Sequence, residues 1–347
     1  MDRRMTRIYA HLAVTAVISL CLSSASAQTV KTDPDAPDFY KGKNINIYIG
    51  VAIGGAYDLE ARLIGRHISS FIPGRPTIVP QNMIGAGGIT MANYLQNLAA
   101  KDGTAVGMVP NTLVSLQAVK AQGVRFDAAQ FGWVGALSQS VETIVAWHTT
   151  GVSSIEDLRN KEFISGATSK GALVYTLPAV LNEFLGTKLK IVTGYQGINQ
   201  VNLALERREV DVVAGSWTGW KLTKSNWLND KTIRILVQTE PKSAELPDVP
   251  SIQELATSDD DRQIITLLLS GSVIGRPLAV APGTASSRIQ TLRQAFTAMV
   301  PDKSFRADAQ IGQIELAPIS GEFIERVVSD VLKTPPHLAE RARKIIE

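Results

Sequence analysis

The sequence predicts an α/β fold made of two lobes. The chain has 347 residues, which is enough for two domains of ordinary size. Its composition, 45% hydrophobic and 19% charged, is that of a globular protein and excludes a disordered chain. Patterns of strand, turn and helix alternate with short connections along most of the chain, which is typical of α/β lobes with largely parallel sheets.

The chain begins with the pattern of a secretory signal peptide. Three arginines within the first seven residues precede an apolar run at 8–22, and Ala25-Ser26-Ala27 has the small residues of a cleavage site. We predict a signal peptide over residues 1–27, cleavage after Ala27 and a mature protein in the periplasm. The apolar run is shorter than the ~20 residues of a membrane-spanning helix. Cys21, the only cysteine, is lost with the signal peptide, so the mature chain forms no disulfide.

The elements of the first lobe are predicted from the spacing of apolar residues. Ile45, Ile47 and Ile49 share one face of a strand, and apolar residues then recur at helical spacing until Pro73-Gly74. The same unit repeats twice. The expected strands lie at 44–51, 77–79 and 104–109, and the expected helices at 59–71, 90–99 and 112–120.

A second set of such units forms the predicted second lobe. Its expected strands lie at 142–147, 163–166, 190–193, 210–214 and 233–237, and its expected helices at 172–185, at 198–207 and after the capping-box sequence at 153–156. A last strand at 273–280 and helices at 286–300, 304–311, 322–332 and beyond are expected to return to the first lobe. We therefore assign 28–140 and 273–347 to the first lobe and 141–272 to the second.

The sequence offers little for catalysis. The histidines that remain after cleavage, His67, His148 and His337, are isolated, and the motifs of zinc proteases, serine hydrolases and P-loop enzymes are absent. Gly85-x-Gly87-x-x-Thr90 lacks the third glycine of a dinucleotide site. A formal net charge of +3 is not that of a nucleic-acid binder. We expect no catalytic residue, metal, cofactor or nucleic-acid partner.

Two glycine turns carry the functional signal. Gly54-Gly55 and Gly85-Ala86-Gly87-Gly88 each lie between a predicted strand and a predicted helix. Glycine lets the backbone approach a ligand closely, and free N–H groups at the start of a helix favour an anion. Tight turns without a ligand are the alternative. Asp58 suits the start of the helix as a cap or as a ligand contact, and Trp217 and Trp220 either wall a cleft or belong to the core.

Five ordered motifs run from the first strand almost to the C-terminus. Residues 53–62 (IGGAYDLEAR) match Pro-Gly-Gly-x-x-Asp-x-x-Ala-Arg with isoleucine in place of proline, and 79–88 (VPQNMIGAGG) match Val-x-x-Asn-x-x-Gly-Ala-Gly-Gly. Residues 101–104 (KDGT) match Pro-Asp-Gly-Tyr, 246–254 (LPDVPSIQE) match Leu-Pro-Asp-Val-Pro-Thr-x-x-Glu, and 281–284 (APGT) add a weaker match. With these motifs the chain resembles the extracytoplasmic solute-binding proteins of the tripartite tricarboxylate transporters, the Bug family.

This resemblance implies a two-lobed periplasmic binding fold, of the type II-like Venus flytrap kind, that closes on a ligand between its lobes. It implies a small carboxylate ligand, namely a di- or tricarboxylate, an acidic amino acid or an aromatic acid. The implied partners are the large and small membrane subunits of the transporter, and the protein itself is expected to be a monomer. Carried over by position, the ligand-binding residues are Ile53, Gly54, Gly55, Ala56, Tyr57, Asp58, Gly85, Ala86, Gly87, Gly88, Thr168, Ser169, Lys170, Gly171, Tyr195, Gln196, Gly215 and Ser216.

The expected function is therefore solute binding without catalysis. The alternative is a secreted α/β enzyme that acts on a small anionic substrate. Such an enzyme would place a nucleophile beside a base, or a metal cluster, in the cleft, and the sequence offers neither. Gly215-Ser216-Trp217 stands where the family often carries an acidic residue, so the class of carboxylate stays open.

Overall fold

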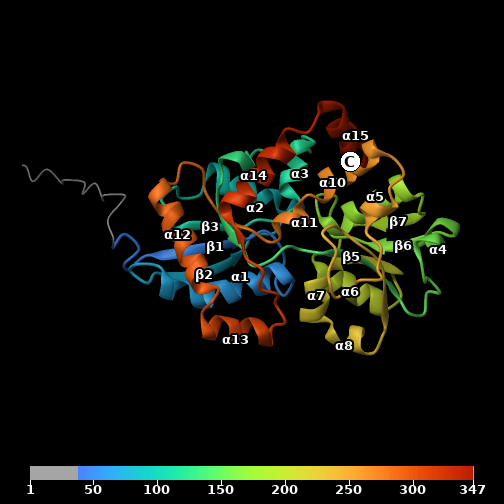
Figure 1. Ribbon diagram of the computed structural model, residues 1–347, viewed down its shortest axis with the longest axis horizontal. Helices are drawn as coiled ribbons and strands as arrows, with labels where there is room; N and C mark the ends of the chain where they lie inside the picture. The colour runs from blue at the N-terminus through green and yellow to red at the C-terminus, as the bar shows by residue number, and fades with distance from the viewer. Residues whose placement is uncertain (1–37, 347) are drawn as a thin grey trace, which may run out of the picture. The chain divides into compact units, whose positions relative to one another are not determined.

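The computed structural model describes residues 38–346. The signal peptide expected over residues 1–27, its cleavage point after Ala27 and Cys21 lie outside the described residues and stay predictions. The described chain forms two mixed β-sheets surrounded by helices (Figure 1). None of the helices within residues 38–346 combines the length and the apolar character that crossing a membrane requires.

The first sheet is built from β1 (Asn44–Ile49), β2 (Thr77–Asn82), β3 (Ala105–Met108), β4 (Gly132–Ala136), β10 (Leu278–Val280) and β11 (Ile319–Ser320). Their order across the sheet is β11-β4-β10-β3-β1-β2. β1 runs parallel to β2 and β3, whereas β10 runs antiparallel to both β3 and β4. A late segment of the chain is thus inserted between two early strands.

The second sheet is built from β5 (Glu142–Trp147), β6 (Phe163–Gly166), β7 (Leu189–Val192), β8 (Val212–Ser216) and β9 (Ile233–Gln238). Their order is β7-β6-β8-β5-β9. β6 runs parallel to β7 and β8, and β5 runs antiparallel to β8 and β9. All five strands come from one continuous stretch of the chain, which follows β4 and ends before β10.

Helices connect the strands and cover the sheets. They are α1 (Ala56–His67), α2 (Ile89–Asn97), α3 (Leu113–Ala118), α4 (Ile155–Asn160), α5 (Leu173–Leu185), α6 (Ile198–Glu206), α7 (Trp217–Thr223), α8 (Ser225–Asn229), α9 (Ile252–Leu255), α10 (Asp259–Leu269), α11 (Gly271–Ile274), α12 (Ser286–Met299), α13 (Lys303–Ile311), α14 (Gly321–Leu332) and α15 (Pro336–Ile346). Short 3₁₀ segments are η1 (Ile68–Phe71), η2 (Ala86–Gly88) and η3 (Ala128–Gln130).

The strand alternation expected for β1 decides which helices cover each face. Ile45, Ile47 and Ile49 pack in one buried cluster with side chains of α1, α12 and α13. Tyr48 points to the other face, into a cluster with α2, α3 and α14 that continues to α5, α10 and α15 beside the second sheet. The C-terminal α15 lies against α10 and α5 (Figure 1). The numbered boundaries of the two lobes stay predictions.

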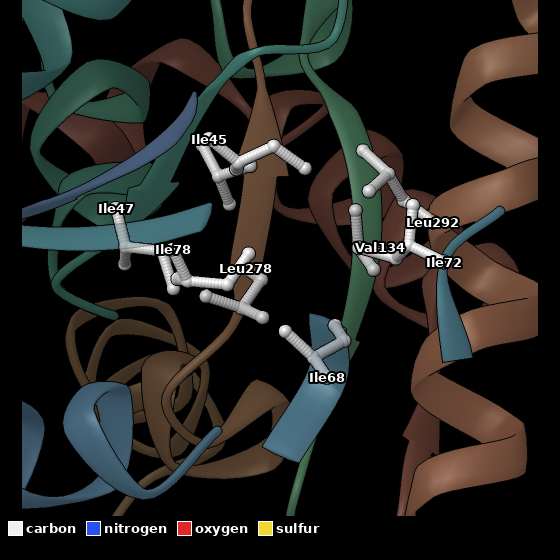
Figure 2. A pocket seen from close by; sticks show the side chains of 9 residues that line it. Ile45, Ile47, Ile68, Ile72, Ile78, Val134, Leu278 and Leu292 are labelled. Carbon is white, nitrogen blue, oxygen red and sulfur yellow. The ribbon is translucent and has the colours of Figure 1, made fainter. Parts of the chain in front are cut away.

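The first-sheet core contains one small gap, which Figure 2 shows. Its volume is about 10 Å³, and its lining is aliphatic, with Ile45, Ile72 and Leu292 among the residues around it. Such a gap is no larger than one water molecule needs, and it offers that water no polar partner. It is a packing defect with no room for an organic ligand.

Strand β10, which the sequence predicts as the final strand, is shorter than expected, and the two-residue β11 follows it in the chain. The expected strand at 273–280 begins only at Leu278, because α11 occupies Gly271–Ile274. Between them Gly275 has a φ of +65°, and a Cβ there would lie 1.9 Å from the carbonyl oxygen of Ser138. This sharp, glycine-dependent turn ends the helix and redirects the chain into the sheet.

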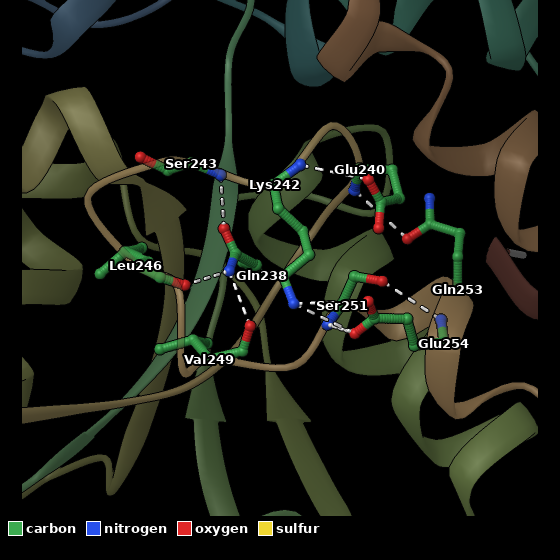
Figure 3. Close-up of polar contacts among 9 residues, drawn as sticks. All are labelled: Gln238, Glu240, Lys242, Ser243, Leu246, Val249, Ser251, Gln253 and Glu254. Atoms are coloured by element: carbon green, nitrogen blue, oxygen red, sulfur yellow. Dashed lines mark hydrogen bonds and ion pairs between the residues drawn. The ribbon is translucent and has the colours of Figure 1, made fainter.

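The loop that carries the LPDVP motif is held in place by one buried amide (Figure 3). The Gln238 side chain donates hydrogen bonds to the carbonyls of Leu246 and Val249, at 2.8 and 2.7 Å, and accepts one from the Ser243 N–H. Ser251 caps α9 reciprocally with Glu254. This motif therefore fixes a connection beside the second sheet, and it does not line the cleft described next.

Candidate functional site

A cleft of about 560 Å³ lies where the loops of the two sheets meet. The segments that follow the carboxyl ends of β1, β2 and β3 line one side, and those after β6, β7 and β8 line the other. Ligands of α/β proteins bind at such strand ends. Among the residues expected at the site, the cleft is lined by Ile53, Gly55, Ala56, Tyr57, Gly85, Ala86, Gly87, Thr168, Ser169, Tyr195, Gln196, Gly215 and Ser216.

Five of the expected residues do not line the cleft, namely Gly54, Asp58, Gly88, Lys170 and Gly171. The Lys170 side chain is exposed to solvent. Gly88 has a φ of +100° and lies so close to Pro110 that a Cβ would be 2.4 Å from its ring. These residues shape the loops around the cleft.

Asp58 holds the first glycine turn in place. Its buried carboxylate accepts hydrogen bonds from the Gly54 N–H, from Arg62 and from Asn82, all at 2.9 Å. Burial opposes ionisation of Asp58, but these hydrogen bonds hold the pKa of the carboxyl below its usual value. Of the two roles that the sequence left open, the structure supports the structural one.

The loops on the two sides of the cleft touch each other at its edge. Gly87, with a φ of +66°, approaches Gly171 so closely that a Cβ would lie 2.4 Å from the Gly171 carbonyl carbon. The Thr112 hydroxyl donates a 3.1 Å hydrogen bond to the Gly171 carbonyl, and Asn199 donates one of 3.5 Å to the carbonyl of Ile53. The structure is therefore a closed arrangement of the two sides.

Several helices begin at this cleft without a side-chain cap. α1, α5 and α6 start from Gly55, Ala172 and Gly197, none of which supplies a capping side chain, and all three line the cleft. The first N–H groups of a helix have no acceptor within the helix, and they carry the positive end of its dipole. Three partial positive charges thus lie at the cleft, one from the first sheet and two from the second, and the carboxylate of Asp58 in the first turn of α1 offsets part of the first.

A charged cluster that the sequence did not indicate lies at the floor of the cleft. Arg276 pairs with Glu60 at 2.6 Å, and both side chains are 2% exposed. A second Arg276 nitrogen donates a 2.6 Å hydrogen bond to the Ser216 hydroxyl, so the ion pair joins α1 to the end of β8. Burial raises the pKa of Glu60, although Arg276 opposes that rise.

Glu142 adds a second carboxylate to this floor. It lines the cleft, is 5% exposed and accepts a 2.6 Å hydrogen bond from the Ser140 hydroxyl through Oε1. Burial raises the pKa of Glu142, which the charge of Arg276 opposes and that of Glu60 reinforces. Burial likewise raises the pKa of Tyr57, so its phenol is protonated and can donate.

Two buried amides face the cleft with unused hydrogen-bonding atoms. Asn111 Nδ2 and both polar atoms of Asn202 have no partner among the described residues, although the side chains are only 3% and 1% exposed. Both residues line the cleft, one from each side. Buried polar groups are normally paired, because an unpaired one costs about 1–3 kcal/mol. These amides are therefore placed for a partner that enters the cleft.

Sequence reasoning missed several residues that define the floor and the walls of the cleft, and only one of them left a usable signal. Asn202 interrupts the apolar face of α6, between Val201 and Leu205. Arg276 and Glu142 lie within apolar stretches of the sequence, and only the topology of the fold brings these stretches together. Trp220, for which two roles were open, does both: it lines the cleft and is 2% exposed.

Comparisons with known proteins bear on this geometry. No family model matches the chain. A UPF0065 protein from Agrobacterium vitis, from the TAR-I ttuE-ttuC' intergenic region, is 26% identical over 231 residues. That match covers 65% of this chain and 64% of the relative, slightly less than two thirds of the relative's length.

Solved structures cover almost the whole described chain. The periplasmic binding protein BugD is 20% identical, with a TM-score of 0.69 over 88% of this chain and 98% of BugD. MatC from Rhodopseudomonas palustris with bound malate is 17% identical, with a TM-score of 0.65 over 88% and 99% of the two chains. R. palustris Rpa4515 with adipate is 18% identical, with a TM-score of 0.67 over 86% and 97%. The chain thus has the two-lobed fold of the periplasmic binding protein BugD, which confirms the fold class and the resemblance to Bug-type solute-binding proteins that the motifs indicated.

Proposed function

We propose that this chain is a periplasmic solute-binding protein of the Bug type that captures a small organic carboxylate. The ligand belongs to the di- and tricarboxylates, acidic amino acids or aromatic acids. The protein acts as a monomer, does no chemistry on the ligand and delivers it to the large and small membrane subunits of a tripartite tricarboxylate-type transporter.

The observation that carries this proposal is the polarity of the cleft lining. Three uncapped helix starts, at Gly55, Ala172 and Gly197, present N–H groups to it. The unpaired amides of Asn111 and Asn202 add further donors from both sides. A carboxylate offers an acceptor to each of these groups, and hydrogen bonds to a charged group contribute about 1.5–3 kcal/mol. No lysine is among the lining residues, and Arg276, which does line the cleft, is already paired with Glu60, so backbone and amide groups supply most of the counter-charge.

The similar structures support the same ligand class. MatC holds malate and Rpa4515 holds adipate, and both molecules are dicarboxylates. The fold likeness to BugD supports a periplasmic location and a role in solute capture. The ligand of this chain is proposed here from its own cleft, with these proteins as support.

The alternative of a secreted enzyme finds less support in the cleft. Its lining contains no histidine, cysteine or lysine, and the Ser216 hydroxyl accepts hydrogen bonds from Arg276 and from the Gly219 N–H. A serine nucleophile needs a base that takes its proton, and both these groups are donors. Within residues 38–346, no three side chains of the kinds that bind metals are grouped closely enough to hold an ion.

The proposal is tested with a panel of succinate, malate, citrate, adipate, aspartate, glutamate and benzoate. At least one acid should raise the melting temperature and titrate calorimetrically as a single site. At one hundred times its Kd, that ligand should add about 2.7 kcal/mol to the free energy of unfolding. Mass spectrometry should recover the acid unchanged. Turnover of the acid would favour the enzyme, and the absence of any binding would reject the proposed ligand class.

Asn202→Leu gives a sharper test, because the unpaired amide predicts opposite effects on stability and on binding. Without ligand, the variant should be at least as stable as the wild type, since it removes two unpaired buried polar atoms. Its Kd for the best acid of the panel should rise at least tenfold. Asn182→Leu is the matched control, since Asn182 is fully engaged with Leu189 and Thr187. That change should lower stability and leave the Kd unchanged.

A further inference from the structure

We infer that the floor of the cleft selects a carboxylate that also carries an ammonium group, and that Glu142 is the residue that pairs with this ammonium. The inference rests on the proposed function and narrows its ligand class.

The first step is the charge balance at the floor. Two carboxylates, Glu60 and Glu142, share a single guanidinium, that of Arg276. Arg276 forms its ion pair with Glu60 at 2.6 Å, and both side chains are only 2% exposed. Glu142 makes no ion pair within the described residues, and Tyr57 beside it is neutral. One negative charge is thus left without a partner at a buried position, which is unfavourable unless a cation or a proton neutralises it.

The second step is where the Glu142 carboxylate lies. Glu142 is the first residue of β5 and stands directly opposite Ser216 in β8, so both side chains project from the same face of the sheet. Ser216 reaches the floor, as its hydrogen bond with Arg276 shows. The Ser140 hydroxyl occupies Oε1 of Glu142, while Oε2 has no hydrogen-bond partner among the described residues. Because Glu142 lines the cleft, this oxygen is an acceptor for a group that enters it.

The third step is that the other walls have the opposite polarity. The helix starts at Gly55, Ala172 and Gly197 attract a negative group, as do the side-chain N–H groups of Asn111 and Asn202. A ligand with carboxylates alone satisfies these walls but brings a like charge to the floor. A ligand that also carries an ammonium on the same carbon skeleton suits both the walls and the floor. Its carboxylates bind the walls, and its ammonium supplies the positive charge that Glu142 lacks.

The experiment compares acids that share one skeleton. Calorimetric titrations of the wild-type protein use succinate, malate and aspartate, and then glutarate, 2-hydroxyglutarate and glutamate. In the series that binds, the amino acid should have a Kd at least tenfold below those of its unsubstituted and hydroxylated counterparts. An unsubstituted or hydroxylated acid that binds as tightly as the amino acid overturns the inference and leaves the proposed function standing. If no acid binds, both are rejected.

Glu142→Gln then tests the residue itself, because glutamine keeps the shape of the side chain and removes its charge. The variant should lose at least tenfold in affinity for the amino acid, while its affinity for the unsubstituted acid stays the same or increases. Glu156→Gln is the control, because this carboxylate lies on the surface of α4 and its ion pair within residues 38–346 is with Arg159. If the ratio of the Kd for the unsubstituted acid to the Kd for the amino acid is the same in Glu142→Gln as in the wild type, Glu142 is not the residue that pairs with the ammonium. Should that variant fail to fold, as judged by circular dichroism, the wild-type series decides alone.

Discussion

Gly87 is the position where one added methyl group tests the closed cleft most directly. Its φ is +66°, and a Cβ there would lie 2.4 Å from the carbonyl carbon of Gly171 and 2.9 Å from the nitrogen of Ala172. Ordinary contacts begin at 3.4 Å, so Gly87→Ala has to move the two loops apart by about 1 Å. The atoms in the way belong to the backbone and cannot rotate aside as a flexible side chain would.

The size of the effect on binding depends on whether each energetic cost of the alanine is present in both the free and the ligand-bound protein or only in the bound protein. The strain of a left-handed alanine, about 1–2 kcal/mol, is present with or without ligand and therefore lowers stability. The collision with Gly171 exists only when the loops meet. Separating them also breaks the 3.1 Å hydrogen bond from Thr112 to the Gly171 carbonyl, which contributes about 0.5–1.5 kcal/mol. With the lost packing we expect about 1.4 kcal/mol less binding free energy, which is a tenfold rise in Kd.

The assay is calorimetric titration with the tightest acid of the carboxylate panel, with circular dichroism to confirm the fold. Gly151→Ala controls for strain, since Gly151 has a φ of +81° with nothing within 4 Å of an added Cβ. Gly55→Ala should have a smaller effect than Gly87→Ala, because φ there is an ordinary −85° and its Cβ would lie 3.4 Å from Ile198. Lys170→Ala should have the least effect. The reasoning is refuted if folded Gly87→Ala binds like the wild type, if Gly151→Ala loses as much, or if Lys170→Ala abolishes binding.

Three further predictions concern stability and export. Glu60→Gln removes the charge-assisted hydrogen bond that Glu60 makes to Arg276 at 2.6 Å and leaves Glu142 as the nearby counter-charge, so urea denaturation should show a loss of about 1.5–3 kcal/mol; a change below about 0.5 kcal/mol would contradict the importance of this pair. The lowered pKa of Asp58 means that its ionised form stabilises the fold above its unfolded pKa of about 3.9, and that this contribution is lost as the pH falls through the lower folded pKa. The difference in stability between the wild type and Asp58→Asn should therefore be largest near neutral pH and shrink in acid, and a pH-independent difference would exclude it. For export, N-terminal sequencing of protein from a periplasmic extract should begin at Gln28, whereas lipid on Cys21 would reject the predicted cleavage.

The parts of the fold that the sequence predicts well are those with local causes. The alternation of Ile45, Ile47 and Ile49 required a strand with one apolar face, and the structure packs that face against α1 and α12. Gly54-Gly55 predicted a turn between this strand and a helix, and in the structure the pair lies between the end of β1 at Ile49 and the start of α1 at Ala56, with a φ of +84° at Gly54. Both signals depend on residues within a few positions of each other, so neither needs knowledge of the topology.

Elements whose residues serve distant partners were missed. β4 carries Gly132 and Gly135, which weaken a strand pattern. Their purpose is packing, because a Cβ at Gly132 would lie 2.6 Å from Ile289 and one at Gly135 would lie 2.8 Å from Phe296, both in α12. α10 begins with three aspartates that suggest a solvated run, although Ser258 caps it and its later residues are buried. In both cases tertiary contacts decide a structure that the local pattern leaves open.

The candidate site also has parts with local causes and parts that depend on distant residues. Its loops could be predicted, because a glycine turn between a strand and a helix is recognisable in a short stretch of sequence and indicates free backbone N–H groups. Its floor could not, because Glu60 and Arg276 are 216 positions apart and meet only when β10 enters the sheet between β3 and β4. In the sequence, Arg276 merely interrupts an apolar run. In the proposed function the loop backbone holds the carboxylate group, and in the further inference the floor distinguishes one carboxylate from another by its charge. The proposed ligand class therefore rests on features of local sequence, whereas the inferred discrimination rests on residues that only the fold brings together.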